Sequence, residues 1–122
     1  MPEKKKTLVL GASDNPSRYS YLAIHRLLSQ GHPVVAIGKK HSTVSEIFIE
    51  NEIKNFENIH TVTLYLNPTH QKEYYTYLLS LYPKRIIFNP GAENDELAEL
   101  AKEKGILVQN ACTLVLLSTN QY

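Results

Sequence analysis

The chain has 122 residues, of which 43% are hydrophobic and 20% charged, and its formal net charge is +1. This length and composition predict a single domain, residues 1–122, with a sizeable hydrophobic core. Because the charge is almost balanced and no run of like charge exceeds Lys4–Lys6, general nucleic-acid binding is not expected. All apolar runs are short, so no membrane-spanning segment is expected either.

Cysteine and histidine are sparse and do not cluster. Cys112 is the one cysteine, so it cannot form an intrachain disulfide. Together with the lack of a recognisable signal peptide, this predicts a cytoplasmic protein. The five histidines are scattered along the chain, so no metal site is expected. Residues 1–6 form a polar, basic leader that we expect to be frayed.

The first half of the chain begins with a strand, a glycine and a helix in succession. An apolar strand is expected over residues 7–10, then Gly11 and a small polar loop, then an amphipathic helix over residues 20–30. The start of such a helix offers unpaired N–H groups and a positive dipole end, and Arg18 adds a charge, so the stretch predicts a phosphate site. We expect Gly11→Val to block the ligand while the fold survives.

An ordinary strand-to-helix turn is the alternative interpretation of this stretch. The dinucleotide fingerprint needs three glycines, and only its first is present. The Gly-Lys-Ser/Thr ending of a Walker A loop is absent. In the alternative, Ser17 or Ser20 simply caps the helix, because serine is favoured at that position.

The second strand is expected over residues 33–37, and it ends at Gly38, Lys39 and Lys40. An NAD site carries Asp or Glu near this position to bind the ribose hydroxyl. Lysine binds phosphate as a point charge, so the ribose bound here is expected to carry a phosphate, as in NADP or coenzyme A. A solvated turn is the alternative for the two lysines.

Residues 42–58 are ambiguous, and the apolar positions 44–49 fit either a short strand or a helical turn. A third strand is expected over residues 60–66. Asn67 and Pro68 then predict a helix start, with Asn as the cap and Pro in the first turn, and this helix should continue to about residue 81.

The remaining chain repeats the strand-to-helix pattern. A strand over residues 85–88 ends at the loop 89–91, and a helix follows over residues 94–104. The last strand is expected over residues 106–108, and residues 112–117 predict a final helical turn that packs on the sheet.

Alternating strands and helices predict an α/β fold: a Rossmann-like, doubly wound parallel sheet of about five strands in three α/β/α layers. The strand orders 3-2-1-4-5 and 2-1-3-4-5 fit the same succession of elements. In both, ligands bind beyond the carboxyl ends of the strands. No catalytic set stands out, so a binding protein is favoured over an enzyme.

Five segments, in order, resemble those of the small CoA-binding proteins, whose Rossmann-like domain is also the nucleotide-binding domain of the succinyl-CoA synthetase alpha subunit. The segments are Leu10–Ser13 with Asn15-Pro16 and Arg18–Ser20, Gly31–Val35 with Ile37-Gly38, Val62–Leu66, Asn89–Asn94 and Ala111–Leu117. The resemblance implies that coenzyme A or an acyl-CoA is bound. Ligase activity is not implied, because the synthetase needs a second domain with a phosphohistidine.

The resemblance also implies where each part of coenzyme A would lie. The pyrophosphate would lie on Gly11, Ala12 and Ser13, close to Arg18 and Ser20. The adenosine end, with its 3′-phosphate, would lie by Gly38, Lys39 and Lys40, although many relatives have Asn-Pro where this chain has Gly38-Lys39. The pantetheine arm would run past Leu66, Asn67 and Pro68 toward Asn89, Pro90 and Gly91.

Two other functions fit the same pattern. One is an NADP(H)-binding redox or sensor protein, whose 2′-phosphate would also suit the lysines. The other is a regulatory interaction module with a vestigial nucleotide site. The expected partner is a small-molecule nucleotide, and a protein partner or a homodimer is left open.

Overall fold

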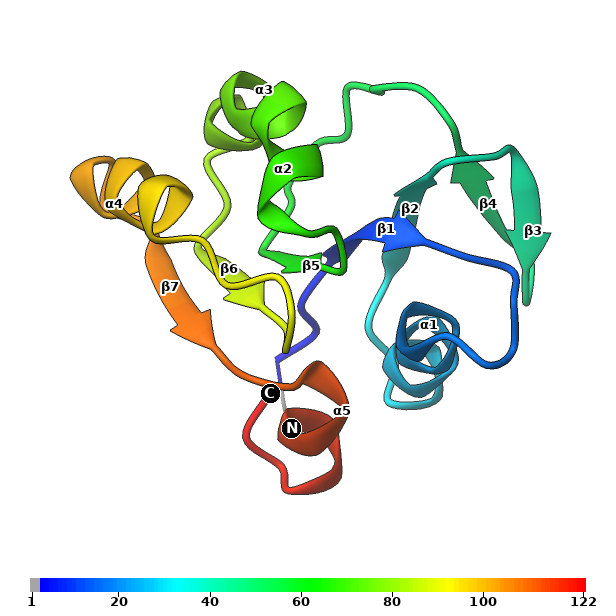
Figure 1. The fold of residues 1–122 in the computed structure, drawn as a ribbon. Helices are drawn as coiled ribbons and strands as arrows, with labels where there is room; N and C mark the ends of the chain where they lie inside the picture. Colours follow the sequence, from blue (N-terminus) through cyan, green and yellow to red (C-terminus); the bar gives the residue numbers. More distant parts are fainter. Residues whose placement is uncertain (1–2) are drawn as a thin grey trace.

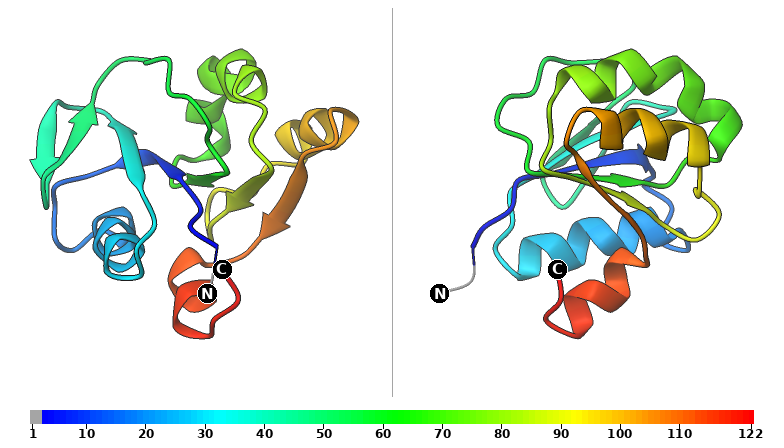
Figure 2. Two further views of the ribbon diagram at one scale, coloured as in Figure 1. Left: turned by 180° about the vertical axis from the view of Figure 1, so that it is seen from behind. Right: turned by 90° about the vertical axis from the view of Figure 1, so that its left-hand side faces the viewer.

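Apolar strands and amphipathic helices form one sheet covered on both faces. The computed structural model describes residues 3–122 (Figures 1 and 2). Its strands are β1 (Thr7–Ala12), β2 (Val34–Gly38), β3 (Ser42–Val44), β4 (Ile47–Glu50), β5 (Thr61–Leu64), β6 (Arg85–Phe88) and β7 (Leu107–Asn110). Its helices are α1 (Tyr19–Ser29), α2 (Pro68–Gln71), the 3-10 turn η1 (Lys72–Tyr74), α3 (Tyr75–Ser80), α4 (Asp95–Glu103) and α5 (Thr113–Ser118).

The sheet order is β3-β4-β2-β1-β5-β6-β7, and every pair is parallel except β3 with β4. The expected doubly wound α/β class is confirmed, but the sheet has seven strands and not five. The five expected strands alone follow the order 2-1-3-4-5. The unassigned segment supplies β4, which pairs with β2, and the six parallel strands then have the Rossmann order 3-2-1-4-5-6.

The β3–β4 hairpin turns at Ser45 and Glu46, whose φ angles are 47° and 71°. A two-residue turn with both φ angles positive usually carries Gly, Asn or Asp. Neither residue here signals such a turn, which explains why the sequence pattern left this segment undecided.

Both faces of the sheet carry hydrophobic core, and successive residues of β1 alternate between them. Leu8 and Leu10 pack in a cluster with Leu78 of α3 and Leu97 of α4, whereas Val9 packs in a cluster with residues of α1 and α5. Figure 2 shows α1 and α5 on one face and α2, α3 and α4 on the other. Burial on both faces is what the unbroken apolar strands predict.

The expected single helix from Pro68 to residue 81 is wrong in one respect, because it is divided into α2, η1 and α3. The predicted cap is confirmed: Asn67 Oδ1 accepts a hydrogen bond from the His70 N–H at 3.0 Å. The apolar spacing of the later residues continues across the 3-10 turn, so the sequence pattern gave no sign of this division. None of the helices in residues 3–122 is long and apolar enough to cross a membrane.

The N-terminal leader and the chain end meet at the edge of the sheet opposite the strand carboxyl ends. The Lys5 N–H donates to His32 Nδ1 at 3.0 Å, and Lys5 Nζ donates to the Tyr122 carbonyl. The Tyr122 ring lies 4.4 Å from the Arg85 guanidinium and 5.0 Å from the His32 ring. Of the leader expected to be frayed, residues 1 and 2 lie outside the described residues, whereas Lys5 is hydrogen bonded.

The burial of His32 leads us to expect that the protein loses stability in acid. Burial lowers the pKa of His32 below its ordinary value of 6.5, and the charges of Lys5 and Arg85 lower it further. The unfolded chain therefore binds a proton at this histidine more readily than the folded protein does. The contribution of neutral His32 to stability is complete above pH 6.5, and it is lost as the pH falls through the lowered pKa of the folded state. We expect the Tm to fall from about pH 7 to about pH 5, and His32→Asn to reduce this fall. Calorimetry across this pH range measures both slopes.

Part of the fall of the Tm with pH should persist in His32→Asn, because burial also lowers the pKa of His60. The asparagine amide oxygen can replace Nδ1 as the acceptor for the Lys5 N–H, so the contact is kept while the titration is removed. If the Tm of the variant fell with pH as steeply as that of the wild type, His32 would not be the group responsible for the loss of stability.

Candidate functional site

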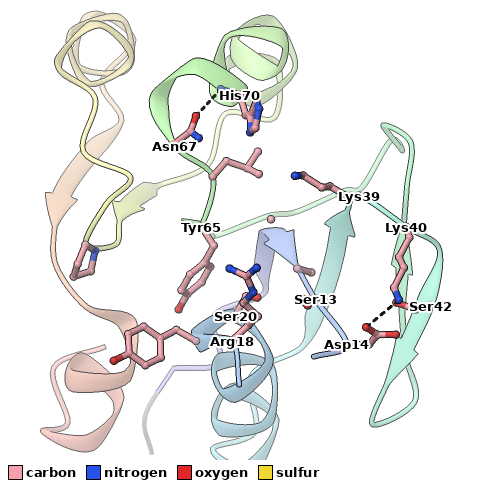
Figure 3. Close-up of a pocket in the computed structure, with 15 residues that line it drawn as sticks. Ser13, Asp14, Arg18, Ser20, Lys39, Lys40, Ser42, Tyr65, Asn67 and His70 are labelled. Carbon is pink, nitrogen blue, oxygen red and sulfur yellow. Dashed lines mark hydrogen bonds and ion pairs between the residues drawn. The ribbon is translucent and has the colours of Figure 1, made fainter. Parts of the chain in front are cut away.

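A cavity of about 590 Å³ lies where the carboxyl ends of the central strands meet (Figure 3). The expected site residues that line it are Gly11, Ala12, Ser13, Arg18, Ser20, Lys39, Lys40, Leu66, Asn67 and Pro90. Residues that line it without having been predicted are Asp14, Tyr19, Ser42, Tyr65 and His70. The sheet topology thus brings together the loops after β1, β2, β5 and β6, as the parallel arrangement predicts.

Gly11 is required by packing inside the protein. Its φ is +93°, and a Cβ added there would lie 2.9 Å from the Tyr65 carbonyl carbon and 3.2 Å from Leu66 Cδ2. The pairing of β1 with β2 also shifts register here, between Leu10 and Ala12. The missing side chain therefore admits the loop after β5, so we expect Gly11→Val to destabilise the fold as well as to block the ligand.

The start of α1 opens on the cavity without a capping side chain. Arg18 occupies the N-cap position, no side chain bonds the first N–H groups, and no acidic residue lies in the first turn. Ser17 is engaged elsewhere, because its N–H and hydroxyl both donate to Asn15 Oδ1, at 3.0 Å and 2.8 Å. The alternative of a serine-capped turn is therefore wrong, and this helix end can accept an anion.

The two lysines after β2 point in different directions. Lys40 Nζ lies 3.6 Å from Asp14 Oδ1, in an exposed pair, whereas Lys39 makes no ion pair within residues 3–122. Figure 3 shows Lys40 directed to Asp14 and Lys39 directed across the strand ends toward the α2 side. Lys39 is therefore the lysine available to a ligand.

Four expected site residues do not line the main cavity: Gly38, Pro68, Asn89 and Gly91. Gly38 lines a smaller cavity of about 200 Å³ beside it. Pro68 occupies the first turn of α2. The Gly91 N–H donates to Glu93 Oε1 at 2.8 Å, which holds the loop after β6 in its turn.

Asn89 is 3% exposed, and its amide joins two strands and a helix. Its Nδ2 donates to Thr63 Oγ1 at 2.7 Å and to the Leu64 carbonyl at 2.9 Å. Its Oδ1 accepts from the Thr113 N–H at 2.9 Å. These bonds engage the donor and acceptor atoms of the amide, so Asn89 holds β5 and α5 to the end of β6 and is not part of the cavity lining.

Gln71 supports the rim of the cavity and was not singled out from the sequence. It is fully buried, and its Nε2 donates to the Leu66 and Ala92 carbonyls, each at 2.8 Å. Its Oε1 accepts from Asn94 Nδ2 at 2.9 Å. This side chain ties the loop after β5 to the loop after β6. The available signal was an amide at a helix position that faces the core.

Tyr65 lines the cavity, but its hydroxyl is enclosed and forms no hydrogen bond. Burial raises the pKa of this phenol to about 12, and the nearby hydroxyls of Thr63 and Thr113 oppose the shift without reaching hydrogen-bond geometry. Tyr65 is therefore neutral at physiological pH. Within residues 3–122, no three His, Cys, Asp or Glu side chains gather as metal ligands. The arrangement suits binding of an anion together with an apolar chain.

Comparisons with known proteins give the following matches. A sequence profile for a CoA binding domain matches residues 5–118. The crystal structure of an uncharacterized protein is 49% identical over 99% of this chain and 100% of its own, with a TM-score of 0.96. A hypothetical protein from Pyrococcus horikoshii OT3 is 25% identical over 90% of this chain and 79% of its own, with a TM-score of 0.81.

A protein from Thermus thermophilus is 21% identical over 98% of this chain and 91% of its own, with a TM-score of 0.81, which shows a shared fold. No curated protein matches the chain.

Proposed function

Since the chain belongs to the CoA binding domain family, we propose that it binds coenzyme A or an acyl-CoA in the main cavity and has no chemistry of its own. The observation that carries this proposal is the open start of α1. An uncapped helix end, without a carboxylate in its first turn and with Arg18 beside it, suits a pyrophosphate.

The remaining parts of the ligand follow from the walls of the cavity. The pyrophosphate rests on Gly11, Ala12 and Ser13, with Arg18 and Ser20 beside it. The pantetheine arm runs along Leu66 toward Pro90, where the lining is more apolar. The adenosine end lies by Gly38 and Lys39, next to the smaller cavity.

NADP(H) is the second candidate ligand. The observation that favours it is Lys39, which follows β2 directly and makes no ion pair within the described residues, where an NAD site would place an acid. A regulatory module that binds neither nucleotide is the third candidate. Residence in a reducing cytoplasm, expected from the single cysteine, stays a prediction.

Thermal unfolding with coenzyme A, NADP and NAD in parallel tests the proposal. A ligand that binds only the folded state stabilises it by mass action, by about 2.7 kcal/mol at 100 times its Kd. We expect coenzyme A to raise the Tm and NAD to leave it unchanged. Arg18→Gln should remove most of the rise by deleting the charge beside the pyrophosphate.

Arg26→Gln is the matched control, because it removes the same charge from the exposed last turn of the same helix. It should retain the rise in Tm. A rise with NADP and none with coenzyme A would make the redox or sensor function the better one, and no rise with any nucleotide would favour the regulatory module.

A further inference from the structure

One edge of the sheet is β7, whose outer side pairs with no other strand within residues 3–122. Figures 1 and 2 show α4 and α5 on opposite faces of the sheet at this edge. The N–H groups of Leu107 and Ala111 donate at 3.1 Å to carbonyls on the β6 side. Because successive residues of a strand direct their backbone groups to opposite sides, Val108 and Asn110 present their N–H and C=O groups to the outer edge.

Neither charge nor proline protects this edge. No Asp, Glu, Lys, Arg or Pro occurs in residues 106–122, and the Leu107 side chain is 59% exposed. The strand at the opposite edge, β3, has only three residues and directly follows Lys39, Lys40 and His41. Natural sheets use short edge strands and lysine to prevent pairing, so β3 is protected, whereas β7 is suited to accept a further strand.

A second copy of β7 fits this edge in an antiparallel register that uses both outward-facing residues. When β7 pairs with itself about a two-fold axis at Gln109, Val108 of one copy lies opposite Asn110 of the other. Every outward N–H and C=O group of β7 then gains a partner. The same register places the exposed Leu107 opposite Ala111 of the second copy, which is apolar and half-buried.

The charges of α4 favour the same antiparallel arrangement. This helix connects two parallel strands and so runs antiparallel to β7, with its first turn near the end of β7 and its last turn near the start. Asp95 and Glu96 lie in the first turn, whereas Lys102 and Lys104 lie at the other end beside one carboxylate, Glu103. A two-fold axis through β7 brings the acidic end of one α4 next to the basic end of the other.

We propose that β7 is a self-association edge, at which two copies of this chain form a dimer with one continuous sheet. A second copy is favoured over an unrelated peptide because the edge is complementary to itself, both in its backbone register and in the charges of α4. The dimer is independent of the proposed ligand, because none of the residues 106–110 lines either cavity.

Sedimentation velocity over a broad range of protein concentrations tests the dimer, because association follows mass action. We expect the wild type to pass from the mass of one chain to twice that mass as the concentration rises. Leu107→Lys places a charge against apolar surface of the second copy, and Asn110→Pro removes an outward N–H that the single chain does not use. Each variant should raise the Kd of the dimer by about 10-fold or more.

Thr43→Lys is the matched control, because it adds the same charge to an exposed residue of the opposite edge strand, β3. It should leave the Kd of the dimer at the wild-type value. Thermal unfolding of each variant, at a concentration at which the wild type is a monomer, verifies that the variant is folded.

A charge exchange on α4 tests the antiparallel orientation. Asp95→Lys and Lys102→Asp should each weaken the dimer several-fold, because each places like charges together across the two-fold axis. The double variant restores opposite charges across the axis and should recover most of the affinity, although both changes oppose the dipole of α4. Loss of the exposed ion pair between Lys102 and Glu99 has little effect on folding.

Each of the following results would overturn the proposal. A wild type that stays a monomer at the highest concentration leaves this edge to a strand of a different protein. A dimer that keeps its Kd in both Leu107→Lys and Asn110→Pro associates through another surface. A dimer that Thr43→Lys weakens as much as Leu107→Lys does pairs through the opposite edge. A double variant of α4 that associates more weakly than either single variant excludes the antiparallel orientation.

Discussion

Gly11→Ala is expected to lower the free energy of unfolding by about 4 kcal/mol, which is a large fraction of the stability of a domain of this size. The added Cβ would lie 2.9 Å from the Tyr65 carbonyl carbon and 3.1 Å from its oxygen, and backbone atoms cannot move aside as a flexible side chain can. The φ of +93° adds backbone strain, because residues with a Cβ rarely adopt it. Urea unfolding of the two proteins measures the difference.

Gly91→Ala separates these two causes. Gly91 has the same φ of +93°, but a Cβ added there meets nothing within 4 Å. Its substitution should therefore cost only the backbone strain, about 1–2 kcal/mol. Equal costs at the two glycines would contradict the packing argument. Gly11 would then owe its place to the backbone conformation and to the ligand, as the sequence alone suggested.

Most of the fold was predictable because its central strands β1, β2, β5 and β6 are buried on both faces. The strand over residues 85–88 was predicted with its observed bounds, and the helix after Asn94 within one residue at each end. The β3–β4 hairpin was not assigned, because Ser45 and Glu46 give no turn signal and only three residues form β3. Local sequence also did not reveal the 3-10 turn within the second helical region, where apolar spacing continues.

The candidate site was predictable to the level of loops and not to the level of side-chain roles. Parallel topology dictates that the loops after four strands share one edge, and the main cavity lies there. Sequence alone does not tell which polar residue faces the cavity and which faces the core. Lys39 and Lys40 are identical and adjacent, yet only Lys40 meets Asp14, because that contact depends on the path of the first loop. Gln71 joins the loops after β5 and β6 through the same tertiary arrangement.

Asn89→Ala is expected to lower the free energy of unfolding by about 3 kcal/mol. The substitution leaves the buried Thr113 N–H without its acceptor and removes the donor that Asn89 Nδ2 supplies to the Leu64 carbonyl. Each unsatisfied buried group costs about 1–3 kcal/mol, although the Thr63 hydroxyl keeps Thr113 Oγ1 as a partner at 2.8 Å. Chemical denaturation followed by far-UV circular dichroism measures the change.

Asn110→Ala is the matched control, because Asn110 pairs with Phe88 through the backbone while its own side chain is exposed. Its substitution should change the free energy of unfolding by no more than about 0.5 kcal/mol. The effects of the two substitutions on stability and on coenzyme A binding distinguish between two roles for Asn89. If Asn89 contacted the pantetheine arm, Asn89→Ala would weaken coenzyme A and leave stability almost intact. If Asn89 joins β5, β6 and α5, as its hydrogen bonds indicate, the larger loss falls on stability, because these bonds lie in the buried part of the protein.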